Sequence, residues 1–96
     1  MNKSKEIYDQ DVLRRNCDKL ISLVSSRLYE NNVPVLQFSK VTGFSQPYLS
    51  KLFSHQYQAE KISIGNILKL LNGVGLTLKV EYTDGKILGN KLDKLD

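Results

Sequence analysis

Apolar residues recur at spacings of three and four along most of this chain, and that helical period limits what the chain can fold into. The longest periodic segment runs from residue 9 to residue 30, and its stripe is Leu13, Cys17, Leu20, Val24 and Leu28, with Ile21 beside it. Pro34 follows, and the residue before a proline resists helical geometry. We therefore expect a first amphipathic helix over residues 9–30, with Cys17 as a buried and inert thiol.

Three shorter periodic segments follow, each bounded by residues that begin or end helices. Pro34 suits the start of a second helix that ends at Gly43, and Ser45 is placed to cap a third helix over residues 46–54. Ser63 and Gly73 bound a fourth in the same way. The apolar positions of these helices are Leu36, Phe38, Val41, Leu49, Leu52, Phe53, Ile64, Ile67, Leu68 and Leu71. Residues 55–61 lack periodicity, which predicts a loop.

The period changes to two after residue 75. Apolar Leu76, Leu78, Val80 and Tyr82 alternate with polar residues, as in a half-buried strand, and Asp84-Gly85 predicts a turn into a return strand at residues 86–88. The predicted fold is mainly α. It has a helical domain of four to five helices over residues 1–75, a short C-terminal strand or hairpin over 76–88, and a flexible tail over 89–96.

Length and composition narrow the class of protein. The 96 residues have room for one domain, and the single cysteine cannot form an intrachain disulfide. The formal net charge of +4 suits an anionic partner. The first ten residues lack the apolar stretch of a secretory signal, and no apolar run approaches the roughly 18 residues of a membrane span. We expect a cytoplasmic protein without a membrane partner.

The segment from residue 33 to residue 54 has the features of a helix-turn-helix. Gly43 can adopt the positive φ of a tight turn, Phe44 points back toward the core, and the small Ser39 lets two helices approach closely. Leu49 and Leu52 fall on the buried face of helix 46–54. The residues that this register turns outward are Gln46, Pro47, Tyr48, Ser50 and Lys51.

From about Leu20 to Leu78 the chain resembles the Cro/repressor-type, or XRE, family of helix-turn-helix regulators. The residues that carry the resemblance are Phe38, Ser39, Gly43, Ser45, Gln46, Leu49 and Leu52, together with ISIGNILKLLNGVGLTL at residues 62–78. The resemblance implies a sequence-specific regulator that binds double-stranded DNA, a dimeric repressor that reads the major groove with helix 46–54. Val35 stands where the family commonly has a glutamine that touches phosphate. Residues 43–53 are also similar to the second helix-turn-helix of AraC-type activators, which bind duplex DNA too.

Candidate DNA-binding residues follow from this register and this resemblance. Gln46 can pair with adenine or hold a phosphate, Ser50 faces the groove, and Pro47 can contribute only shape or a methyl contact. Tyr48 either reaches the DNA or packs on the adjacent loop. Lysines are expected at the phosphate backbone, and the resemblance adds the loop that follows the third helix. The full candidate set is Lys40, Ser45, Gln46, Pro47, Tyr48, Ser50, Lys51, His55, Tyr57, Gln58 and Lys61.

Chemistry other than binding finds little support in the sequence. His55 is the only histidine, and with one cysteine and no paired acidic residues nearby, neither a metal site nor a catalytic dyad can be built from it. We predict no enzyme activity, no metal and no cofactor. A second copy of the chain is an expected partner, because one recognition helix buries too little for a specific site. The alternative is the antitoxin of a toxin–antitoxin pair, which acts mainly by binding a toxin protein and also binds its promoter.

Overall fold

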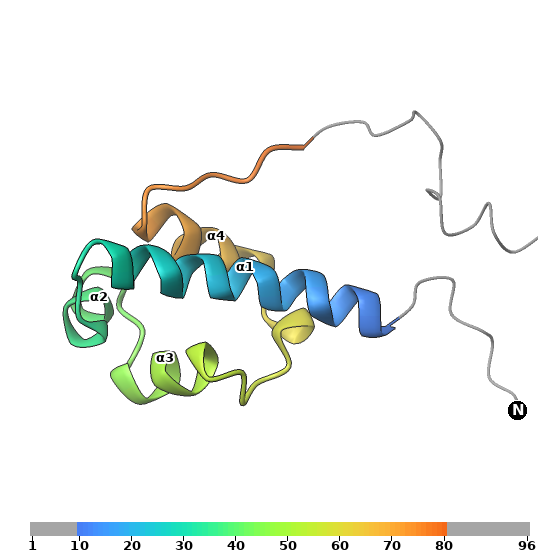
Figure 1. Cartoon of the computed structure of the whole chain (residues 1–96), viewed down its shortest axis with the longest axis horizontal. Helices are drawn as coiled ribbons and strands as arrows, with labels where there is room; N and C mark the ends of the chain where they lie inside the picture. The colour runs from blue at the N-terminus through green and yellow to red at the C-terminus, as the bar shows by residue number, and fades with distance from the viewer. Residues whose placement is uncertain (1–9, 81–96) are drawn as a thin grey trace, which may run out of the picture.

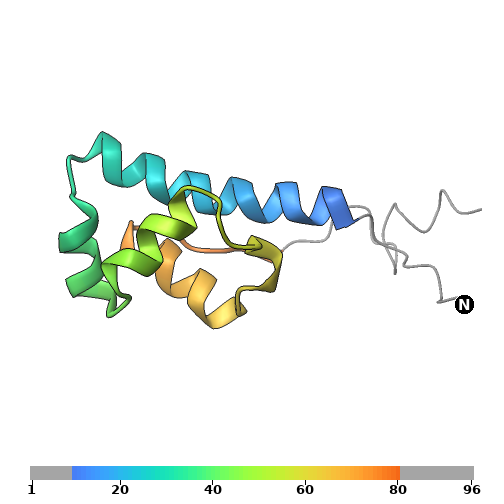
Figure 2. The ribbon, with the colours of Figure 1, turned by 90° about the horizontal axis from the view of Figure 1, so that it is seen from below.

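The computed structural model describes residues 10–80, which form four α-helices and one short 3-10 helix (Figure 1). In chain order these are α1 (Gln10–Glu30), α2 (Val35–Thr42), α3 (Gln46–Phe53), η1 (Ala59–Lys61) and α4 (Ile64–Gly73). The long α1 runs the length of the domain, and α2 lies at its C-terminal end. Seen from below in Figure 2, α3 lies in front of α1 and α4. The predicted mainly helical fold is confirmed.

The core lies where these helices meet, and each of them contributes to it. Its buried members are Ile21, Val24, Leu28, Phe38, Leu49, Leu52, Ala59, Ile67, Leu70 and Leu71. Helices of eight to ten residues, such as α2, α3 and α4, are too short to be stable alone in water. Their stability therefore comes from burying these side chains together.

The helix ends follow the predicted capping chemistry. Gly43 has a φ of 85°, and its backbone N–H donates to the Ser39 carbonyl oxygen at 2.9 Å, which closes α2. The Ser45 hydroxyl accepts from the backbone N–H of Tyr48, and the Ser63 hydroxyl accepts from that of Asn66, both at 3.2 Å. These bonds satisfy N–H groups that a helix start leaves open. The predicted starts of α3 and α4 and the predicted end of α2 are confirmed.

Several residues predicted on apolar faces lie at the surface. Their exposed fractions are 40% for Leu13, 48% for Leu36, 73% for Val41 and 63% for Ile64. The first turns of α1 extend beyond the other helices in both views, which leaves Leu13 uncovered (Figures 1 and 2). In α4 the buried side chains are Ile67, Leu70 and Leu71, and Ile64 precedes them by a turn at the helix start. Cys17 is half-buried.

The two segments that flank α4 differ in how far they follow the prediction. The loop over residues 55–61 contains η1, and Ala59 is buried against the core. After α4, Gly75 turns with a φ of 82° and Leu76 packs on the core. No strand forms within residues 76–80. Tyr82, the Asp84-Gly85 turn, the return strand at 86–88 and the tail at 89–96 lie outside the described residues, so the hairpin stays a prediction.

Two further observations concern residues 10–80. The guanidinium of Arg27 in α1 donates from Nε to the Val74 carbonyl oxygen at 2.9 Å and so ties the end of α4 to α1. In this part of the chain we find no helix whose length and apolar character would let it cross a membrane.

Candidate nucleic-acid interface

The α2–turn–α3 unit holds α3 with one face fixed and the other free. Leu49 and Leu52 are 0% and 1% exposed, so they anchor α3 on the core. Phe44, in the turn, packs against the same core as predicted, and Ser39 is buried in α2. Figure 2 shows α3 from its outer side with no other element in front of it. The fold therefore presents the outer face of α3 to any partner.

The outer face of α3 is polar, small and nearly free of charge. Gln46, Pro47, Ser50 and Lys51 are all exposed, as the helical register predicts. Ser45 is exposed as well, but its oxygen already accepts the capping bond from Tyr48. Lys51 is the one charged side chain of α3. This face offers an amide, a hydroxyl, a proline ring and an ammonium group within two helical turns.

Tyr48 does not project outward as the register predicted. It is half-buried, and its ring lies between two other aromatic rings, with centroids 5.5 Å from Phe44 and 5.3 Å from Tyr57. The Lys69 ammonium lies 5.2 Å from the centre of the Phe44 ring. Burial, and then the neighbouring Tyr57, raise the pKa of the Tyr48 hydroxyl. We call Phe44, Tyr48 and Tyr57 the aromatic row. Of the two positions predicted for Tyr48, the structure shows the one in which its ring packs on the adjacent loop.

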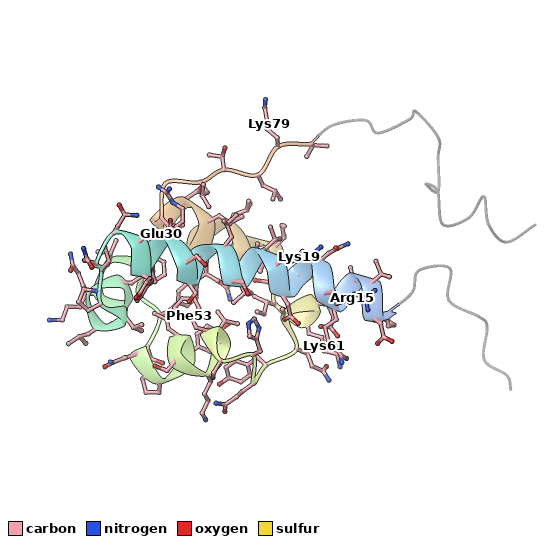
Figure 3. All side chains as sticks on the ribbon, viewed as in Figure 1. Arg15, Lys19, Glu30, Phe53, Lys61 and Lys79 are labelled. Atoms are coloured by element: carbon pink, nitrogen blue, oxygen red, sulfur yellow. The ribbon has the colours of Figure 1, made fainter. Side chains whose placement is uncertain are left out.

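The predicted lysine contacts come from three separate elements around α3. Lys40 lies on α2, Lys51 on α3 and Lys61 on η1, and all three are exposed. Figure 3 shows Lys61 on the same side of α1 as α3. Tyr57 and Gln58 are exposed on the intervening loop, where a shallow groove is lined by Tyr48, Tyr57, Gln58, Lys61, Ser63 and Asn66. Apart from His55 and Lys40, which lies on α2, the candidate residues thus belong to α3, its N-cap, or the loop and 3-10 helix that follow it.

His55 turns toward α1 and not toward the outer face of α3. Its Nδ1 lies 3.5 Å from Asp18 Oδ1, and its Nε2 lies 3.3 Å from Ser22 Oγ. The backbone at His55 has a φ of 61°, a conformation that turns the chain sharply after α3. Asp18 is a carboxylate partner that the sequence analysis did not assign to His55. The sequence could not show this contact, because Asp18 is brought in by tertiary packing.

The Ser22, His55 and Asp18 side chains share the atom order of a serine hydrolase triad but not its surroundings. Ser22 lies in the middle of α1, where the backbone N–H groups are engaged within the helix. They are therefore not free to stabilise an oxyanion. His55 is 43% exposed, so its contacts lie in water and not in a closed site. The cluster instead fixes the end of α3 to α1.

Two further titratable groups lie between α1 and η1. Glu60 accepts from the Arg14 guanidinium at 3.2 Å and its side chain is 6% exposed. Its own backbone N–H, and then Arg14, lower the pKa of the Glu60 carboxyl.

Burial raises the pKa of the Cys17 thiol, and the nearby Glu60 and Asp18 add to the effect. A thiol that resists ionisation is a poor nucleophile and a poor metal ligand. Among residues 10–80 no three His, Cys, Asp or Glu side chains form a group that could hold a metal ion.

No protein-family model matches the chain, and no curated protein or solved structure matches it significantly. The resemblance to the Cro/repressor family therefore rests on the residues quoted for it.

Proposed function

We propose that this protein is a sequence-specific regulator that binds double-stranded DNA by placing α3 in the major groove. The observation that carries the proposal is the helix-turn-helix arrangement itself. Leu49 and Leu52 fix α3 on the core, while Gln46 and Ser50 lie exposed on its outer face. An α-helix fits the major groove of B-DNA, and amide and hydroxyl groups pair with base edges there.

The charges around α3 support contact with the DNA backbone. Lys51 is exposed on α3, Lys40 on α2 and Lys61 on η1, and the chain carries a formal net charge of +4. Lysine binds phosphate as a point charge without base preference, so these contacts would add affinity and orientation. Each phosphate neutralised steepens the dependence of log affinity on log salt by about 0.9. We expect Lys51→Ala to weaken binding to all sequences evenly and to reduce that slope.

A second copy of the chain completes the proposal. The exposed face of α3 spans two helical turns, and one such helix buries less surface than specific operators require. Two copies related by a two-fold axis would place two α3 helices one turn of DNA apart. We place the interface at residues 76–88, where the sequence predicts a strand or hairpin, and we propose that the complex acts as a repressor of a promoter.

To test this function, the full chain is used to select binding sequences from a random duplex library. Fluorescence anisotropy then measures its affinity for the selected duplex. We expect the selected duplex to bind more tightly than a scrambled one at every salt concentration. Gln46→Ala should cost about 1–3 kcal/mol at one base position per half-site. Gln37→Ala, an exposed substitution on α2 away from the outer face of α3, is the matched control and should bind as the unchanged protein does.

Equal affinity for selected and scrambled duplexes would contradict a sequence-specific role. A stable complex with a purified toxin encoded by a neighbouring gene would favour the antitoxin alternative, in which toxin binding is the main role and promoter binding is retained. Sedimentation of the full chain gives the oligomeric state independently of DNA.

A further inference from the structure

We propose that Pro47 recognises the C5-methyl group of a thymine, so that the protein requires a T·A pair at the base that faces the first turn of α3. The inference rests on the proposed function and adds which base pair the outer face of α3 selects there.

Pro47 occupies the point of α3 that faces most directly away from the core. At about 100° per residue, Leu49 and Leu52 lie about 200° and 140° around the helix from Pro47, so the proline ring points opposite their midpoint. Both leucines are buried, and Pro47 is exposed. Its exposed neighbours Gln46 and Ser50 are polar. The ring is therefore the apolar centre of a polar face.

The position of this ring is fixed on both sides. The Ser45 hydroxyl accepts from the Tyr48 N–H at 3.2 Å, which closes the first turn of α3 around Pro47. Tyr48 in turn is packed between Phe44 and Tyr57 in the aromatic row. A proline ring has almost no rotamer freedom to lose on binding. The contact surface is thus already formed in the unbound protein.

The chemistry of the major groove makes thymine the base that suits such a surface. Guanine, cytosine and adenine present donors and acceptors in the groove, whereas thymine also presents a methyl group. Pro47 has no N–H, so it cannot pair with any of these polar atoms. A polar base edge covered by the ring would lose water without a replacement bond, which is costly. A methyl group covered by the ring loses nothing and buries apolar surface.

Substitution of deoxyuridine for thymidine tests the inference, because it removes the methyl group and leaves base pairing intact. Duplexes with one replacement each are made from the sequence that the full chain selects, and their affinities are measured by anisotropy. We expect an affinity loss of roughly fourfold at one thymine per half-site, the value of one buried methyl group. Replacements at the other thymines should have little effect.

Protein variants assign the effect to the ring. Both Pro47→Ala and Pro47→Ser keep only Cβ of the ring carbons, so the deoxyuridine penalty should be reduced in each, and more in Pro47→Ser, whose hydroxyl makes the position polar. Gln37→Ala should retain the full penalty. Circular dichroism shows whether each variant is still folded. If Pro47→Ser does not fold, Pro47→Ala alone is used to test the role of the ring.

The outcomes separate this inference from the proposed function. Failure to select any sequence would refute the proposed function and this inference with it. A selected sequence without an obligatory thymine, or a deoxyuridine penalty that is unchanged in Pro47→Ser and Pro47→Ala, would overturn the role of Pro47 and leave the proposed function standing.

Discussion

Replacement of Gly73 by alanine should destabilise the domain, because Gly73 is where α4 meets α2. A Cβ at this position would lie 2.7 Å from Phe38 Cε1, 3.1 Å from Phe38 Cζ and 3.2 Å from Thr42 Cγ2. Real Cβ atoms do not approach other heavy atoms within 3.0 Å, so the ring must move. Phe38 is 2% exposed and lies 6.5 Å, centre to centre, from the Phe53 ring. It therefore has little space into which to move.

The expected size of the effect comes from two opposing contributions. Overpacking a well-filled core costs about 1–3 kcal/mol. Alanine recovers up to about 1 kcal/mol over glycine in a helix, and less at the helix end where Gly73 lies. We expect a net loss of about 1–2 kcal/mol in the free energy of unfolding. For a domain of this size each kcal/mol lowers the melting temperature by about 4–8 °C.

Urea denaturation followed by circular dichroism measures this loss, and Gly65→Ala is the matched control in the same helix. A Cβ at Gly65 meets nothing within 4 Å, so this variant should be neutral or more stable. Equal stabilisation by both alanines would refute the reasoning, because it would mean that α2 and α4 are not in close contact at Gly73. If the clash is the cause, Phe38→Leu should remove part of the penalty of Gly73→Ala in a double-mutant cycle.

Three further predictions concern stability. Leu52→Ala should cost about 2–5 kcal/mol in urea denaturation, whereas Ser50→Ala on the opposite face should stay within about 0.5 kcal/mol; equal effects would mean that the register of α3 is wrong. Gly43→Ala should lower stability by about 1–2 kcal/mol through backbone conformation alone, since its φ is 85° and a Cβ there meets no atom within 4 Å; a neutral result would contradict the left-handed turn. The lowered pKa of Glu60 contributes stability that is complete above the ordinary value of 4.5 and is lost as pH falls through the lowered pKa. An acid titration of unfolding should therefore be shallower in Glu60→Gln than in the unchanged protein, and identical curves would exclude this contribution.

The parts of the fold that the sequence predicted are those set by neighbouring residues. Ser45 caps α3 and Gly43 ends α2 through bonds to residues three or four positions away, so local pattern suffices to place them. Leu49 and Leu52 were placed on the buried face by helical spacing, which depends on the helix alone. The exposure of Gln46 and Ser50 follows from the same spacing.

The parts that were missed depend on residues distant in sequence. The helical register turned Tyr48 outward, and the sequence could not decide between contact with DNA and packing on the loop, because its half-buried position depends on Tyr57 and that loop has no periodic signal. His55 meets Asp18 only once α1 and the loop after α3 have packed together. Leu13 continues the apolar stripe of α1, but whether it is covered depends on how far the other helices reach along α1. Helical spacing predicts which face of a helix a residue lies on, but it does not predict whether another element covers that face.

The aromatic row has a consequence for how sequences related to this one could diversify. Tyr57 belongs to the loop, yet its ring is in contact with Tyr48 of α3, which in turn meets Phe44 of the turn. Substitutions in the loop therefore affect the packing of the helix that presents Pro47. Under the proposed function, a descendant that shortens the loop or replaces Tyr57 would remove packing that holds Tyr48 beside Pro47, and a position that touches no base would then alter target preference.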